Sequence, residues 1–278
     1  MRDRFRPDNL SRRAAAGRTA VAARVIAMAM IALVCGCATT SSPRAVRAVL
    51  PMRVSAAQMS RLVVATTYAR SPAAPQDPDP FKPETGIVLH PTLSQVVYAK
   101  PGGPPVAILP VTEIKNPTWV PVVQSQPGWD RILLPTRPNH STGWIYLGHG
   151  GLRTAYSAYR VEVNLSAYRL TVLDAGRSLG SWEVGVGAPG TPTPTGRTFL
   201  LASLAPVHPT YSRLILPLGA HSDTLSTFGG GPGTVALHSW PDQGVFGHAV
   251  SHGCVRVPGS ALPILSRVPL GSTVMIVS

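Results

Sequence analysis

Turn-forming residues occur throughout the chain, and they limit it to short elements of secondary structure. Its 278 residues include 29 Pro and 26 Gly, which interrupt helices and mark turns. Between them lie short runs in which apolar and polar residues alternate, the pattern of strands, whereas long helical patterns are scarce. Strands do not alternate with helices as in a parallel sheet, so we expect an all-β fold.

Residues 86–150 are predicted to form a small domain of short strands. Apolar runs at 95–99, 105–109, 118–123, 129–134 and 143–147 are separated by turns that contain Pro or Gly, a spacing typical of a small barrel. The order of these segments resembles a bacterial SH3-like domain, a module that often accompanies cell-wall enzymes. Trp119, Trp129 and Trp144 have two interpretations. We favour packing in the core or at the barrel mouth over lining a peptide or glycan groove.

The first 36 residues are predicted to be a signal peptide. Seven Arg residues and an uncharged apolar run at 25–35 occur here, and this run is too short for a membrane-spanning helix, which needs about 20 residues. It ends in Val34-Cys35-Gly36-Cys37, which resembles a bacterial lipoprotein processing site, so Cys37 is a candidate for lipidation. The alternatives are an ordinary cleaved signal peptide, a short uncleaved anchor, and twin-arginine export through Arg12-Arg13.

Residues 37–85 are predicted to be a lipidated N-terminus followed by a Pro- and Ala-rich linker. The segment is rich in Ala, Thr, Ser and Pro and ends in PAAPQDPDP at 72–80, a composition typical of a semi-rigid tether. A weakly amphipathic stretch at 45–69 could form a short helix. We therefore expect an exported lipoprotein that faces the cell wall, either in the periplasm or at the outer face of the cytoplasmic membrane.

The charge of the chain is consistent with an anionic partner. The formal net charge is +13, and residues 1–36 contribute 7 − 2 = +5, which leaves 13 − 5 = +8 for the rest. Such a charge favours attraction to an anionic wall or membrane, with solubility alone as an equal alternative. No nucleic-acid-binding motif is present, so nucleic acid is not an expected partner. The sequence does not indicate an oligomeric state.

A Ser-His-Gly-Cys sequence near the C-terminus suggests nucleophilic catalysis. Cys254 ends this sequence, and His238 lies 254 − 238 = 16 positions earlier. Cleavage before Cys37 and lipidation of that residue leave Cys254 unpaired, which marks a reactive thiol in an exported protein. Cysteine catalysis needs a thiol, a base that deprotonates it, and N–H groups that hold an oxyanion.

Residues 156–278 resemble the L,D-transpeptidase catalytic domain of the YkuD type. The matching segments, in family order, are a hairpin at 161–173, Val186-Gly187 with TPTG at 193–196, His238, SHGCVR at 251–256 and GSTV at 271–274. The resemblance implies that Cys254 attacks a tetrapeptide stem of peptidoglycan, releases D-Ala and forms a thioester. Transfer to an amine of a second stem then gives a 3-3 cross-link. Hydrolysis of the same thioester, by an L,D-carboxypeptidase, is the alternative. No cofactor is implied.

The resemblance also implies a catalytic role for individual residues. Cys254 is the nucleophile, a role that suits a thiol because its pKa can fall toward neutrality beside an imidazole. His238 is the base, and it is oriented by the backbone carbonyl of Ser239 in the manner of a triad. The N–H groups of Gly253 and Cys254 are the expected oxyanion donors. His252 either assists the thiolate or supports its loop, and we favour support.

Four further residues are candidates for substrate binding. Arg256 is expected to pair with a carboxylate of the stem, with a solvated surface position as the alternative. The other three are Ser251, Phe228 and Tyr211, and Phe228 together with Gly229-Gly230-Gly231 is expected to form a mobile flap.

The sequence departs from the family pattern at one position and leaves two rival hypotheses. Ser239 stands where many family members have Gly, and His248 has no role that we can assign. The first rival hypothesis is a zinc site made of His238, His248, His252 and Cys254, which the Ser-His-Gly-Cys motif argues against, so no metal is expected. The second is a non-catalytic wall-binding lipoprotein.

Overall fold

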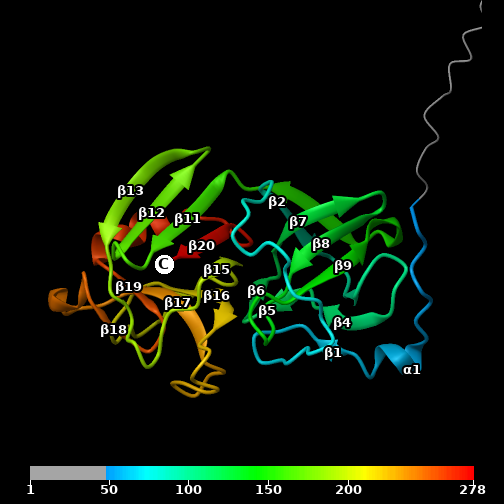
Figure 1. The fold of residues 1–278 in the computed structure, drawn as a ribbon, viewed down its shortest axis with the longest axis horizontal. Coiled ribbons are helices and arrows are strands. Elements are labelled where there is room, and N and C mark those ends of the chain that lie inside the picture. The colour runs from blue at the N-terminus through cyan, green and yellow to red at the C-terminus, as the bar shows by residue number, and fades with distance from the viewer. Residues whose placement is uncertain (1–47) are drawn as a thin grey trace, which may run out of the picture. The chain divides into compact units, whose positions relative to one another are not determined.

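The computed structural model describes residues 48–278, and strands dominate it (Figure 1). In this range the helical elements are short: α1 (Ala56–Met59), α2 (Leu262–Leu265), and the 3-10 turns η1 (Leu147–His149), η2 (Gln243–Val245) and η3 (Gly259–Ala261). The prediction of an all-β fold is therefore confirmed. Among the described residues no helix is long and apolar enough to cross a membrane.

The first half of the described chain forms an eight-stranded sheet. Its hydrogen-bonded order is β1 (Val63–Val64), β4 (Pro105–Leu109), β3 (Gln95–Tyr98), β9 (Thr142–Tyr146), β8 (Trp129–Leu133), β7 (Val120–Gln126), β2 (Ile87–Pro91) and β10 (Leu152–Tyr156). Neighbouring strands are antiparallel except β1 and β4, which are parallel. No pairing within residues 48–278 joins β1 to β10, so this sheet does not close into the small barrel that we expected. The SH3-like identity of this part stays a prediction.

A two-stranded hairpin projects from this sheet toward the second half of the chain. It consists of β5 (Thr112–Glu113) and β6 (Asn116–Pro117). Ile114 and Lys115 form its turn with positive φ angles of 45° and 58°. This conformation suits a tight hairpin turn, but residues other than Gly, Asn and Asp rarely adopt it.

The second half forms two larger sheets and a small one. The five-stranded sheet has the order β13 (Arg177–Glu183), β12 (Arg169–Asp174), β11 (Tyr159–Asn164), β20 (Thr273–Val277) and β15 (Gly196–Phe199). The three-stranded sheet has the order β16 (Ile215–His221), β17 (Thr234–Ser239) and β19 (Val255–Val257). A short parallel pair joins β14 (Val186–Gly187) to β18 (Ala249–Ser251).

These two larger sheets face each other across one apolar core (Figure 1). In β11 and β12 every second residue is buried, as the alternating sequence predicts for strands with one face toward a core. The core side chains come from both sheets and include Val161 and Val172 from the first, and Leu216, Leu237 and Val255 from the second. One face of the three-stranded sheet thus packs against the core, and its other face points away from the core.

The eight-stranded sheet packs around a second core, to which Phe199 and Leu201 of the second half also contribute. Two of the three predicted tryptophans are buried against this sheet. Trp129 and Trp144 are buried in an aromatic cluster with Tyr98, so the favoured interpretation as core residues is confirmed for them. Trp119 is only half-buried and stacks on His90 at a centroid distance of 5.1 Å.

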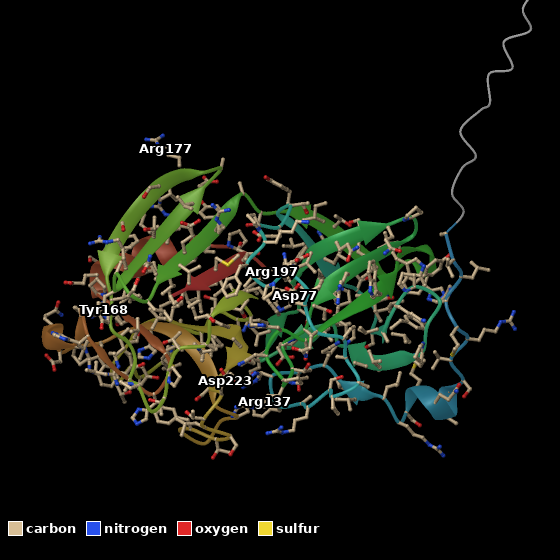
Figure 2. The ribbon with its side chains drawn as sticks, in the orientation of Figure 1. Asp77, Arg137, Tyr168, Arg177, Arg197 and Asp223 are labelled. Carbon is tan, nitrogen blue, oxygen red and sulfur yellow. The ribbon has the colours of Figure 1, made fainter. Side chains whose placement is uncertain are left out.

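The described part of the predicted linker differs from a free tether. Residues 63–82, which we call the strap, run along both halves of the chain. Ala65, Thr67, Ser71 and Ala74 are buried, and the backbone pairs with β4 and then with the 137–142 loop. Asp77 forms a buried ion pair with Arg197 of β15 (Figure 2). Such contacts depend on partners far away in the sequence, so composition alone could not predict them.

Candidate active site

The strand register places the predicted catalytic residues on one face of the three-stranded sheet. β17 and β19 are parallel, with Leu237 opposite Val255 and His238 opposite Arg256. Because side chains alternate along a strand, Leu237 and Val255 point into the core, while His238 and Arg256 point to the opposite face. Cys254, two residues before Arg256, lies on that same face. The sheet therefore brings the thiol, the imidazole and the guanidinium together.

This face lines a pocket of about 450 Å³. Seven of the nine predicted catalytic and substrate-binding residues line it: Cys254, His238, His252, Arg256, Ser251, Phe228 and Tyr211. The other two, Ser239 and Gly253, flank lining residues in the chain. Among residues 48–278, Cys254 is the free cysteine.

A tight turn precedes the thiol, and its hydrogen bonds change one expected role. Gly253 has a φ of 112°, which a residue with a side chain rarely adopts. Ser251 Oγ accepts from the Gly253 N–H at 3.1 Å and donates to the Cys254 carbonyl at 2.6 Å. The Gly253 N–H is thus directed to Ser251, not toward an oxyanion as we expected. Of the two predicted donors, this leaves the Cys254 N–H.

Two threonines of the 191–196 loop stabilise this turn by hydrogen bonds to its backbone. Thr193 Oγ1 donates to the Gly253 carbonyl at 2.9 Å and accepts from the Gly187 N–H at 2.9 Å. Thr191 Oγ1 donates to the Ser251 carbonyl at 2.8 Å. The TPTG segment at 193–196 belongs to the predicted family pattern, but that pattern predicts no role for these hydroxyls. They connect the loop to the backbone on both sides of His252.

The orientation of His238 agrees with the predicted role of Ser239. His238 Nδ1 lies 2.9 Å from the Ser239 carbonyl oxygen. A carbonyl oxygen can only accept, so Nδ1 carries the proton and Nε2 is left as an acceptor. Burial lowers the pKa of His238 below its ordinary value; the Ser239 bond opposes this effect and the charge of Arg256 adds to it. The imidazole is therefore neutral at rest and able to take a proton.

The protonation of the thiol depends on its burial in the pocket. Burial raises the pKa of Cys254 above its ordinary value, although a hydrogen bond to the Ala236 backbone and the charge of Arg256 both act to lower it. Because desolvation disfavours the charged form of both groups, the resting pair consists of a neutral thiol and a neutral imidazole.

Aromatic side chains surround the polar residues of the pocket. Tyr211 meets His238 edge-on at 5.0 Å and Trp240 at 5.5 Å between ring centroids. Arg256 lies over the Trp240 ring at 3.9 Å, a distance at which a cation–π interaction is favourable. Phe228 stacks on His252 at 4.8 Å, which is consistent with the favoured supporting role of His252. Trp240 was missed by the sequence analysis although it lies two residues after His238.

The first half of the chain also contributes to the pocket wall. Thr67 and Tyr68 of the strap and Ile114 of the β5–β6 hairpin line the pocket. Thr67 Oγ1 lies 3.0 Å from His221 Nε2 of β16, and this contact fixes the strap against the sheet that carries His238. No local pattern in the sequence marks these residues.

The remaining residues discussed from the sequence lie away from the pocket or outside residues 48–278. The side chain of His248 does not line the pocket, and its carbonyl accepts from the Val186 N–H. In the part of the chain that the structure describes, no group of three or more His, Cys, Asp or Glu residues is arranged to hold a metal ion. Cys37 and the predicted signal peptide lie outside the described residues.

Comparison with known families identifies the second half of the chain. Residues 158–276 match the family model of the YkuD L,D-transpeptidase catalytic domain. This match covers the five-stranded and three-stranded sheets and the pocket face described above, and it identifies this segment as such a domain. A comparison with curated proteins found no match.

Solved structures of L,D-transpeptidases are similar to the chain at low identity. An L,D-transpeptidase from Mycobacterium smegmatis is 17% identical, covers 57% of this chain and 99% of its own, and gives a TM-score of 0.36. The catalytic domain from Enterococcus faecium is 18% identical over 42% of this chain and 95% of its own, with a TM-score of 0.35. L,D-transpeptidase 3 from Mycobacterium tuberculosis is 17% identical over 50% of this chain and 75% of its own, with a TM-score of 0.36. These scores are low, so the identification of the domain depends on the family match.

Proposed function

We propose that this chain is a peptidoglycan L,D-transpeptidase with Cys254 as the nucleophile. The family match supports the reaction class. The observation that supports the nucleophile is the common pocket face: Cys254, His238 and Arg256 line one pocket from two paired strands, and Ser239 orients the imidazole. The substrate is the tetrapeptide stem of peptidoglycan.

The proposed reaction proceeds in two acyl transfers. The Cys254 thiol passes its proton to Nε2 of His238 as sulfur attacks the carbonyl carbon between the third and fourth residues of the stem. The N–H of Cys254 is the candidate donor to the oxyanion. When the C–N bond breaks, His238 returns the proton to the nitrogen of the departing D-Ala, which leaves a thioester. An amine of a second stem attacks the thioester, His238 takes its proton, and the thiol is restored.

Arg256 is proposed to bind a carboxylate of the stem. Its guanidinium is held over Trp240, and its buried Nε has no protein partner in the described part of the chain. A buried N–H group without a partner is costly, and a carboxylate would satisfy it with a charge-assisted hydrogen bond. This arrangement favours a pocket role for Arg256 over the alternative of a solvated surface residue.

The test is mass spectrometry of the protein incubated with tetrapeptide stems. We expect release of D-Ala, a tripeptide-acyl adduct on Cys254, and a cross-linked product. Cys254→Ala should give none of these, while Cys37→Ala, which changes a cysteine outside the Ser-His-Gly-Cys motif, should retain them all. Release of D-Ala by the Cys254→Ala protein would contradict the proposal. Release without a cross-linked product would instead indicate the L,D-carboxypeptidase.

We also propose that the protein is exported and anchored by a lipid on Cys37. The charged leader, its short apolar run and the Val34-Cys35-Gly36-Cys37 sequence support this proposal. Cys37→Ala should then move the protein from the membrane fraction to the soluble fraction. Retention of that variant in the membrane fraction would rule out the lipid as the anchor.

A further inference from the structure

The loop between β16 and β17, residues 222–233, covers one side of the catalytic pocket. Phe228, Gly229, Gly231 and Pro232 line the pocket. A backbone bond from the Ser222 N–H to the Gly233 carbonyl, 2.9 Å long, closes the base of the loop. The tip turns tightly, with reciprocal bonds between Phe228 and Gly231. The loop therefore places Phe228 against His252 in the pocket wall.

The loop has little apolar packing that could fix its position. Most residues from Asp223 to Gly231 are exposed, and Phe228 itself is 51% exposed. Gly229, Gly230 and Gly233 have φ angles of 58°, 80° and 72°, and glycine allows many other conformations as well. A loop with so few buried contacts opens at low free-energy cost unless something outside it holds it.

Arg137, from the first half of the chain, holds both limbs of this loop. Its guanidinium donates to the carbonyls of Ser222 at 2.9 Å and Leu225 at 2.8 Å on the first limb, and to Pro232 at 2.9 Å on the second. The guanidinium also fits against Gly233, where a Cβ atom would lie 3.0 Å from Arg137 Nη2. Figure 2 shows Arg137 beside Asp223 at the base of the loop.

The backbone around Arg137 is itself well anchored. Its N–H donates to the Ala69 carbonyl at 3.0 Å, and its carbonyl accepts from the Ser71 N–H at 2.8 Å. Two residues later, Asn139 donates to the His221 carbonyl at 2.7 Å and accepts from the His221 N–H at 2.8 Å. The arginine thus extends from a fixed position in the first half of the chain to a weakly packed loop in the catalytic domain.

We propose that Arg137 is a positioning residue that acts through Phe228 to shape the binding site for the acyl-donor stem. The inference rests on the proposed function for its substrate. Arg137 does not line the pocket, so its removal should weaken substrate binding and leave the chemistry at Cys254 intact. A charged donor that satisfies three carbonyls also restrains the loop more than neutral bonds would.

The experiment compares Arg137→Ala with Arg131→Ala in the full chain. Arg131 is a matched control because it also donates to a backbone carbonyl, that of Gln76, and to Thr142 Oγ1, but it contacts no residue of the loop. We expect Arg137→Ala to raise KM for the stem peptide roughly tenfold with little change in kcat. Hydrogen exchange in residues 222–233 should become faster. Arg131→Ala should change neither.

A double mutant separates positioning from a general structural role. If Arg137 acts through Phe228, Phe228→Ala alone should raise KM, and Arg137→Ala should add little in that background. Arg137→Lys, which keeps the charge but not the planar fork, should have an intermediate KM and serves if Arg137→Ala does not fold. Fully additive effects on KM, or unchanged exchange in the loop, would overturn the proposal. Failure of the proposed function is recognised separately, because the wild-type protein would then release no D-Ala.

Discussion

The buried ion pair between the strap and the catalytic domain leads to a strong prediction about stability. Arg197 Nε lies 2.6 Å from Asp77 Oδ2, and Nη2 lies 2.7 Å from Oδ1 (Figure 2). The residues are 3% and 7% exposed. In Asp77→Ala the guanidinium stays buried and keeps one carbonyl acceptor, that of Lys82. Removing one partner of a buried pair costs about 3–5 kcal/mol, so we expect the free energy of unfolding to fall by about 4 kcal/mol.

Urea unfolding followed by tryptophan fluorescence measures this effect. With a slope of about 2 kcal/mol per molar, the midpoint should fall by about 2 M. The control is Glu162→Ala, because Glu162 pairs with Arg160 at 2.8 Å with side chains 44% and 35% exposed. Exposed pairs contribute about 0–1 kcal/mol. An Asp77→Ala protein that loses no more stability than Glu162→Ala would refute the reasoning.

Replacing both partners tests the physical cause. In Asp77→Leu with Arg197→Met, no charge remains buried, and apolar side chains of similar volume fill the space. Such replacements are often neutral or stabilising, so the double variant should be more stable than Asp77→Ala. A double variant as unstable as the single one would show that packing, not the buried charge, causes the loss.

Two further predictions concern the pH dependence of stability and the turn at the thiol. Burial raises the pKa of Glu113 to about 7 and lowers the pKa of His221 to about 4. Glu113 therefore stabilises the fold below about pH 4.5, and this stabilisation is lost as the pH rises through 7. His221 stabilises the fold above about pH 6.5, and this stabilisation is lost as the pH falls through 4. In the wild type these two pH dependences nearly cancel. The free energy of unfolding of Glu113→Gln in urea should therefore equal that of the wild type near pH 4.5 and exceed it by up to about 3 kcal/mol at pH 8. Parallel curves of unfolding free energy against pH for the two proteins would contradict this prediction. Thr193→Val leaves the Gly253 carbonyl and the Gly187 N–H without their hydroxyl partner, so kcat for D-Ala release should fall roughly tenfold. The half-buried Thr171→Val in β12 is the control for that measurement, and equal kcat values for the two variants would argue against a role for the Thr193 hydroxyl.

The sequence predicted most accurately those parts of the fold that depend on local alternation. The runs at 159–164 and 169–173 alternate in apolarity, and they form β11 and β12 with one buried face. The motif residues were assigned to one site from the resemblance, and in the structure the spacing along a strand decides which face each of their side chains occupies. His238 and Cys254 thus lie on the same face as Arg256.

Structure that depends on distant partners was not predictable in the same way. The strap carries the composition of a linker, yet its Thr67 and Asp77 bind residues 154 and 120 positions further along the chain. The direction of the Cys254 pKa also depends on the folded pocket. Motif chemistry suggests an activated thiolate, whereas burial within the folded pocket opposes ionisation. The use of the Gly253 N–H by Ser251 depends on a side-chain rotamer that the motif does not encode.

The strap also constrains the order in which the protein can fold. Thr67 contacts Thr234, 167 positions later in the chain. The strap therefore lacks some of its hydrogen-bond partners until β17 has been synthesised. Contacts of such long sequence separation slow folding, because the intervening loop must close before they form. Until then the apolar residues of the strap, such as Ala65 and Ala74, lack part of their final packing. A protein assembled in this way is expected to reach its active form late, when nearly the whole chain is present.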